Sequence, residues 1–306
     1  MLKRFRGCFL LLLTALIWGS AFVAQSAGMQ HIGPFTFNCI RTLLGGAVLL
    51  PVILGMRLLR RGRPAPKTDL RMTVRGGICC GVLLCIASGF QQAGIVYTTA
   101  GKAGFITALY VVLVPLLGLL THKKPPKRIW LCVLCAVAGF WLLCMKEPFR
   151  PGRGDLLVLC CTLFFAFHII IVDYFCERAV DPTVMSCIQF LTAGCLLGIG
   201  MLLFESPQLS AIRGAGVPIL YAGIMSCGVA YTLQILGQRE TPPALATLLM
   251  SLESLFAALS GWLILHEWLS LRECAGCFLV FTAVTAAQLL TAADNQSSKD
   301  ERKVQE

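Results

Sequence analysis

The sequence predicts an all-α integral membrane protein whose ten transmembrane helices form two inverted five-helix repeats. Of its 306 residues, 57% are apolar and 13% are charged, whereas about 25% of the residues of a typical soluble domain are charged. Long apolar stretches recur along the whole chain, and the second half repeats the spacing of the first. This composition favours a protein that crosses a membrane many times.

Each predicted span has about 20 mostly apolar residues, the length that a membrane helix needs. The spans are 8–28, 35–55, 74–95, 101–121, 129–146, 155–175, 184–204, 214–236, 243–265 and 273–292. The first follows a basic segment and resembles a signal peptide, but its apolar run is longer than the usual 7–15 residues, so we expect an uncleaved helix. The connections are short, and residues 293–306 are expected to form a disordered cytoplasmic tail.

The basic residues are distributed unevenly between the two sides of the membrane. Ten spans place both termini on one side, which then holds 19 of the 26 Lys and Arg residues, while Arg41 lies within a span. The positive-inside rule therefore predicts a cell (cytoplasmic) membrane protein with both termini in the cytoplasm. This distribution accounts for the net charge of +11 without nucleic acid as a partner.

The chain repeats itself with a shift of 148 residues early in each half and 143 residues later. The matched pairs are Pro34 with Pro182, Cys39 with Cys187, Arg41 with Gln189, Gln91 with Gln234, and Tyr110 with Glu253. The repeats are predicted at 1–146 and 155–292. Because each contains an odd number of helices, the second must be inverted relative to the first, an architecture that places a substrate site near the midplane between the halves.

Four stretches carry a resemblance to a known family: LLTALIWGSAFVAQ (12–25), PFTFNCIRTLLGG (34–46), YTTAGKAGFITALYVVLVPLLGLL (97–120) and LLMSLESLFAALSGWLILHEWLSLRECAGCFLV (248–280). The chain resembles the drug/metabolite transporter superfamily, specifically its ten-helix permeases with two EamA-type repeats. The resemblance implies a carrier, commonly an efflux protein, for a metabolite or drug. Two features depart from the pattern: Ser254 follows Glu253 where the family often has proline, and Gln189 takes the place of Arg41 in the second repeat.

Glu253 is the one ionisable side chain in the apolar run 244–265. A charged side chain at the bilayer centre costs about 2.5–3.5 kcal/mol on insertion scales, and such residues usually face a bundle interior or a wet cavity. One interpretation is a carboxylate that exchanges protons or recognises a cation. The other is a neutral glutamic acid that hydrogen-bonds to a neighbouring helix.

Three further ionisable residues are candidates for the transport site. Arg41 could bind Glu253 or a substrate carboxylate, or its head could snorkel to the interface. Lys102 could lie at a cavity mouth or serve as an interfacial anchor. His168 could shuttle protons near neutral pH, or be a neutral, hydrogen-bonded core histidine.

Aromatic and amide side chains supply a candidate lining for an organic solute. Trp18, Phe22 and Gln25 fall at i, i+4 and i+7, on one face of the first helix. The other candidates are Gln91, Tyr110, Tyr231 and Gln234. Aromatic rings with a few polar groups are typical of small-molecule sites, although ordinary helix packing would use the same residues.

Small residues predict close helix packing. Gly77–Gly81 and Gly194–Gly198 have the G-x-x-x-G spacing that lets membrane helices approach one another. The pairs Cys132–Cys135 and Cys274–Cys277 lie in equivalent helices, the fifth and the tenth, where they favour a smooth small-residue face over a metal site. These two helices are expected to support the bundle or to form a homodimer.

The function predicted from these patterns is secondary transport of a small organic solute, with export favoured and proton coupling through Glu253 or His168 as a hypothesis. No P-loop and no G-x-S-x-G motif is present, and neither a cofactor nor enzymatic activity is expected. Two alternatives stay open: a membrane-embedded lipid enzyme, which would need His168, Asp173 and Glu253 to cluster, and a non-transporting scaffold.

Overall fold

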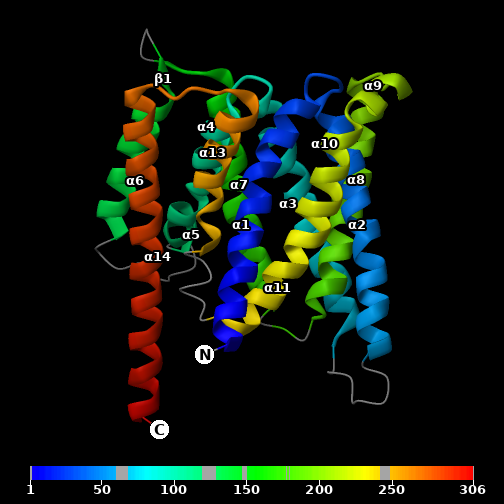
Figure 1. Ribbon diagram of the computed structural model, residues 1–306. Coiled ribbons are helices and arrows are strands. Elements are labelled where there is room, and N and C mark those ends of the chain that lie inside the picture. Colours follow the sequence, from blue (N-terminus) through cyan, green and yellow to red (C-terminus); the bar gives the residue numbers. More distant parts are fainter. Residues whose placement is uncertain are drawn as a thin grey trace.

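The computed structural model describes residues 2–59, 68–118, 129–146, 150–176, 178, 180–241 and 249–305. The helices run roughly along one direction, and both termini lie at the same end of the bundle (Figure 1). We call this end the terminal face, and the opposite end, where α9 and the strand β1 lie, the distal face. The shared position of the termini agrees with an even number of membrane crossings.

The first half contains α1 (Leu2–Gly28), α2 (Pro34–Leu59), α3 (Leu70–Ile95), α4 (Ala100–Ala108), α5 (Tyr110–Gly118) and α6 (Ile129–Cys144). The fourth predicted span, 101–121, is therefore two consecutive helices, because the helix is interrupted at Leu109. Two short strands, β1 (Met145–Lys146) and β2 (Arg150–Pro151), pair in antiparallel fashion in the connection to the second half.

The second half begins with α7 (Arg153–Cys176) and α8 (Pro182–Phe204). Its third membrane helix is composite: α9 (Leu209–Gly214) and α10 (Gly216–Leu220) lead into the π-helix η2 (Tyr221–Ala230) and then α11 (Tyr231–Glu240). The last helices are α13 (Glu253–Leu265) and α14 (Leu271–Gln305). Residues 242–248, where the ninth predicted span starts, lie outside the described residues.

Within the described parts of the chain, six helices are long and apolar enough to cross a membrane, and three shorter apolar helices cover 100–114, 130–142 and 253–265. The helix α14 completes the set at the tenth predicted span. It continues to Gln305 instead of ending near residue 292, so the segment expected to be disordered is helical. No proline interrupts this stretch, and its Lys, Glu, Arg and Gln residues are good helix formers.

The helix contacts have the symmetry of two inverted repeats. Equivalent helices pack against each other: α2 against α8, α4 against α13, and α6 against α14. Other large contacts occur in equivalent pairs. The packing of α3 on α7 corresponds to that of η2 and α11 on α1, and the packing of α13 on α1 corresponds to that of α4 and α5 on α7. A pseudo-two-fold axis in the membrane plane produces this pattern, which confirms the predicted fold.

The pair α6 and α14 stands at one side of the bundle (Figure 1). Gly139 of α6 allows the close contact, because a Cβ atom there would lie 2.8 Å from Val280 Cγ2 of α14. Large apolar side chains on the outer faces of both helices are exposed, including Trp130, Leu134 and Phe278, as suits contact with lipid. The supporting role predicted for the fifth and tenth helices fits this position, and the homodimer stays a prediction.

Glycines set the spacing between α3 and α8. A Cβ atom on Gly81 would lie 2.6 Å from Thr192 Cβ and 2.8 Å from the Gln189 carbonyl oxygen. On the neighbouring contact, a Cβ atom on Gly194 would lie 2.6 Å from Leu43 Cδ2 of α2. The predicted G-x-x-x-G pairs therefore do bring helix backbones together, and they do so between the two repeats.

The two glycines Gly81 and Gly89 of α3 provide a matched test of this packing. We expect Gly81→Ala to lower the thermal unfolding temperature in detergent, because overpacking a tight contact costs about 1–3 kcal/mol. Gly89→Ala should not lower it, since a Cβ atom there meets no atom within 4 Å and alanine is the better helix former by about 1 kcal/mol. Equal unfolding temperatures for the two variants would contradict the role of Gly81.

Candidate functional site

The centre of the candidate site is a contact between Glu253 and Tyr110. Glu253 is the first residue of α13 and is 8% exposed, and its carboxylate forms a hydrogen bond with the hydroxyl of Tyr110, the first residue of α5. The repeat aligns these two residues with each other, and equivalent residues meet where the pseudo-two-fold axis passes between their helices. Both stand at helix starts inside the bundle, and interrupted helices of this kind form the substrate sites of many transporters.

Three aromatic rings lie beside this contact. The ring of Tyr231, which starts α11, makes edge-to-face contacts with Trp18 of α1 and Phe190 of α8, at centroid distances of 5.3 and 5.1 Å. Tyr231 also interacts electrostatically with both Glu253 and Arg41. The structure therefore brings Trp18, Tyr110, Tyr231, Arg41 and Glu253 into one neighbourhood, which we call the central site.

Arg41 of α2 is buried in the bundle, with 7% of its surface exposed. Its Nε donates a hydrogen bond of 2.6 Å to Asn38 Oδ1, and Asn38 Nδ2 donates to the Ser88 carbonyl of α3 at 2.7 Å. The guanidinium also lies 5.9 Å from the centroid of the Phe37 ring. The partner of Arg41 is thus Asn38 and not Glu253, and sequence reasoning missed Asn38 although it precedes Arg41 by one helical turn.

The hydrogen-bond partner of His168 is not one of the residues of the central site. Its Nε2 is 3.0 Å from Oε1 of Gln189, which joins α7 to α8, and both side chains are buried. Gln189 is the repeat equivalent of Arg41. The side chain of Asp173 is outside the described residues. The acid/base set of the enzyme interpretation is therefore divided, because His168 and Glu253 bond to different partners on different helices.

The glutamine candidates mostly bond between helices of the first half. Gln91 Nε2 donates to Thr107 Oγ1 at 3.2 Å, which joins α3 to α4. Gln25 Nε2 donates to the carbonyl of residue 21, and the backbone carbonyl of Gln25 accepts from Gln92 Nε2 of α3 at 3.1 Å. Gln234 is half-buried on α11. These contacts suit helix packing more than a solute lining.

The two remaining candidates, Phe22 and Lys102, also lie among helix contacts. Phe22 is buried in the main apolar cluster, 3.8 Å from where a Cβ atom on Gly104 would lie. Lys102, in the first turn of α4, forms an ion pair of 2.5 Å with Glu273 of α14. Its side chain is only 6% exposed, so Lys102 ties the fourth helix to the tenth instead of standing alone at a cavity mouth.

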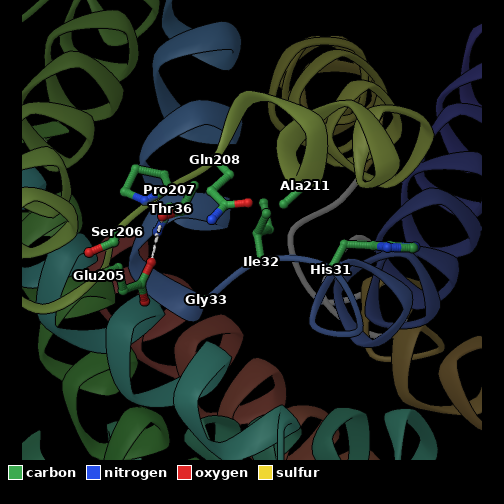
Figure 2. Close-up of a pocket in the computed structure, with 9 residues that line it drawn as sticks. All are labelled: His31, Ile32, Gly33, Thr36, Glu205, Ser206, Pro207, Gln208 and Ala211. Atoms are coloured by element: carbon green, nitrogen blue, oxygen red, sulfur yellow. Dashed lines mark hydrogen bonds between the residues drawn. The ribbon is translucent and has the colours of Figure 1, made fainter.

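A pocket of about 420 Å³ opens at the distal face, between the loops that follow α1 and α8. Glu205, directly after α8, accepts hydrogen bonds there from the backbone amides of Phe35 and Thr36 at 2.9 and 2.8 Å, and from the Thr36 hydroxyl at 2.5 Å. Figure 2 shows this bond to Thr36, together with the side chains of Gln208 and Ile32, which also line the pocket. Gly33 leaves room for the carboxylate, because a Cβ atom there would lie 2.3 Å from it.

Glu267 accepts hydrogen bonds from backbone amides at the start of α4, as Glu205 does at the start of α2. Its carboxylate accepts from the amides of Ala100 and Gly101 at 3.0 and 3.3 Å, and the preceding residue, His266, has the left-handed conformation that ends α13. Anionic side chains are favourable at helix N-termini because the free amides and the helix dipole are positive there. Two acids of the second half thus cap two helices of the first half at the distal face. Sequence reasoning missed Glu205, whose one signal is its place directly after an apolar helix.

Comparison with known proteins agrees with this architecture. Residues 5–145 and 152–287 each match the EamA-like transporter family. An uncharacterized transporter of Archaeoglobus fulgidus is 31% identical over 280 residues, which are 91% of this chain and 84% of that protein. The uncharacterized inner membrane transporter YedA of Escherichia coli is 27% identical over 286 residues, which are 90% of this chain and 88% of that protein.

A solved structure supports the fold independently of close sequence similarity. One crystal structure, 18% identical in sequence, superposes with a TM-score of 0.64 and covers 94% of this chain and 98% of that chain. The family resemblance seen in the four sequence stretches is confirmed, because both halves match the same family. The chain belongs to the EamA-like transporter family and is a multi-pass membrane transporter with two EamA domains.

Proposed function

We propose that this protein exports a small organic solute across the cytoplasmic membrane by alternating access, with the central site as the solute-binding site. The contact between Glu253 and Tyr110 on the pseudo-two-fold axis supports this proposal most directly, because both halves contribute to it equally. In an inverted-repeat carrier, the halves rock around a site of this kind.

The chemistry of the central site favours an amphipathic solute with at least one polar or charged group. Glu253 and Arg41 lie within electrostatic reach of the same ring, Tyr231, yet each bonds to a different partner. The edges and faces of Trp18, Tyr231 and Phe190 add apolar surface for the rest of the solute. Ionisable residues at this depth commonly mark substrate or proton pathways, so Glu253 is also the proposed coupling residue.

Closure of the distal face would then depend on Glu205 and Glu267. Each carboxylate joins the second half of the chain to a helix start of the first half. A movement that separates the halves at the distal face has to break these bonds, while the bonds can reform when the site opens toward the terminal face.

The role of Glu253 can be tested before the solute is identified. Purified protein in detergent would be screened for thermal stabilisation by amino acids, nucleosides, sugars and organic cations at two pH values, because a bound solute raises apparent stability by mass action. We expect Glu253→Gln to lose the stabilisation that the wild type shows. Glu273→Gln, which changes an acid outside the central site, should retain it. Equal stabilisation of the wild type and Glu253→Gln would remove the carboxylate from solute recognition.

The distal caps predict a specific loss of stability. Glu205→Ala leaves two backbone amides and a hydroxyl without their acceptor, so we expect it to lower the unfolding temperature more than Asp69→Ala. Asp69 is the matched control because it caps α3 with one exposed bond of 3.1 Å, within its own half. Thermal unfolding of the two variants measures the difference, and a smaller effect for Glu205→Ala would count against the cap.

The proposed orientation places both termini in the cytoplasm. An epitope at the C-terminus should be resistant to protease in intact cells and digested after permeabilisation. The same epitope inserted between Pro207 and Gln208, which are exposed at the distal face, should be digested in intact cells. The reverse pattern would place the termini outside.

A further inference from the structure

The composite membrane helix formed by α10, η2 and α11 contains the ten-residue π-helix η2, from Tyr221 to Ala230. π-Helices are rare, occur mostly as single turns, and are frequent at functional sites. This one ends directly before Tyr231, the ring that contacts Trp18 and Phe190 in the central site. The winding of η2 therefore sets the direction in which Tyr231 points.

Side chains of α1 bond to η2 along its whole length. The Ser20 hydroxyl lies 2.6 Å from the Tyr221 hydroxyl near the start. In the middle, the Trp18 indole Nε1 donates to the carbonyl of Ser226 at 3.1 Å. At the end, the Thr14 hydroxyl lies 3.4 Å from the carbonyl of Ala230. The Trp18 indole thus donates to a backbone carbonyl of η2, whereas the Thr14 hydroxyl shares its one proton between the Leu10 carbonyl of α1, at 2.9 Å, and the more distant Ala230 carbonyl.

The positions of these contacts fit a π-helix and not an α-helix. At about 82° per residue in a π-helix, residues 221, 226 and 230 fall within about 50° of one another. At 100° per residue in an α-helix they would spread over about 180°. One face of the π-helix can thus meet α1 along its whole length.

The opposite face of η2 packs against α2, again through residues that the π-helical winding brings to one face. Cys227 packs on Gly45, where a Cβ atom would lie 2.4 Å from Cys227 Cβ, and a Cβ atom on Gly228 would lie 2.5 Å from Val48 Cγ1. A Cβ atom on Gly223 would lie 2.7 Å from Leu44 Cδ2. Because η2 is held between α1 and α2, both contact faces depend on one winding.

We propose that Trp18 and Thr14 are positioning residues of the central site: their side-chain donors hold η2 in its π-helical winding and so aim Tyr231 at the solute. This inference rests on the proposed function, because the direction of Tyr231 matters for transport only where the central site binds the solute. Each residue that converts from π to α winding adds about 18° of rotation. Conversion of the whole segment would turn Tyr231 away from its aromatic partners and Cys227 away from Gly45.

The native thiol of Cys227 reports the winding without any solute. Cys227 is 5% exposed, and Cys187 of α8, 3% exposed, serves as an internal reference for global unfolding. Alkylation of both thiols by N-ethylmaleimide in detergent would be followed by mass spectrometry of the peptides. Trp18→Phe keeps an aromatic ring but lacks the indole N–H, and Thr14→Val keeps the volume but lacks the hydroxyl.

Trp18→Phe should accelerate alkylation of Cys227 about five-fold, the factor that corresponds to the loss of one hydrogen bond. Thr14→Val should accelerate it by a smaller factor, because the Thr14 hydroxyl bonds mainly to Leu10, and Cys187 should stay protected in both variants. Thr162→Val is the matched control, because the Thr162 hydroxyl donates to the Ile106 carbonyl between α7 and α4, away from η2. It should leave Cys227 at the wild-type rate. Wild-type protection of Cys227 in both Trp18→Phe and Thr14→Val overturns the inference.

Solute binding separates this inference from the proposed function. If Trp18→Phe exposes Cys227 and weakens a Glu253-dependent stabilisation by solute, both stand. If Cys227 stays protected while the Glu253-dependent stabilisation persists, the inference fails alone. If Cys227 becomes exposed but solute stabilisation does not depend on Glu253, the winding mechanism stands and the proposed site fails.

Discussion

A carboxyl group in the middle of a membrane protein needs protein around it on every side, and this constraint governs the arrangement of the helices. An exposed charge at the bilayer centre costs about 2.5–3.5 kcal/mol on insertion scales. Glu253 avoids lipid because it lies between its own half and Tyr110 of the other half. Both halves surround this carboxyl group because it lies at the pseudo-two-fold axis. The helices α6 and α14, away from this point, stand at the side of the bundle with apolar faces exposed.

Close packing around that axis depends on glycine because lipid provides little hydrophobic drive for helices to associate. Gly81 brings α3 to α8, and Gly45 brings α2 to η2 at Cys227. The same glycines leave little space for movement within these pairs. At the distal face the two halves are also joined by polar bonds, from Glu205 to the start of α2 and from Glu267 to the start of α4.

Apolar length and internal repetition predicted the fold well, because both are properties of the whole chain. The alignment of the two halves pairs Tyr110 with Glu253 without predicting their contact, whereas the spans and the inversion follow from it and from apolar length. The break at Leu109, the π-winding of η2 and the partner of Arg41 do not, since each is decided by contacts with other helices. Lys102 was similarly beyond prediction, because its partner Glu273 is distant in sequence. The end of α14 differs from the disordered tail that we expected, because good helix formers can extend a helix that has already started.

The two repeats are equivalent in backbone but not in the residues near their axis. Tyr110 corresponds to Glu253, and Arg41 corresponds to Gln189, so a phenol is matched with a carboxyl group and a guanidinium with an amide. Inverted repeats let the two halves exchange conformations, which makes the two directions of opening similar in backbone energy. The direction of transport must then be decided by side chains that differ between the two repeats. This chain breaks the symmetry at the central site, where Glu253 and Arg41 both interact electrostatically with Tyr231, and at η2, since no π-helix is found among the described residues of the first half.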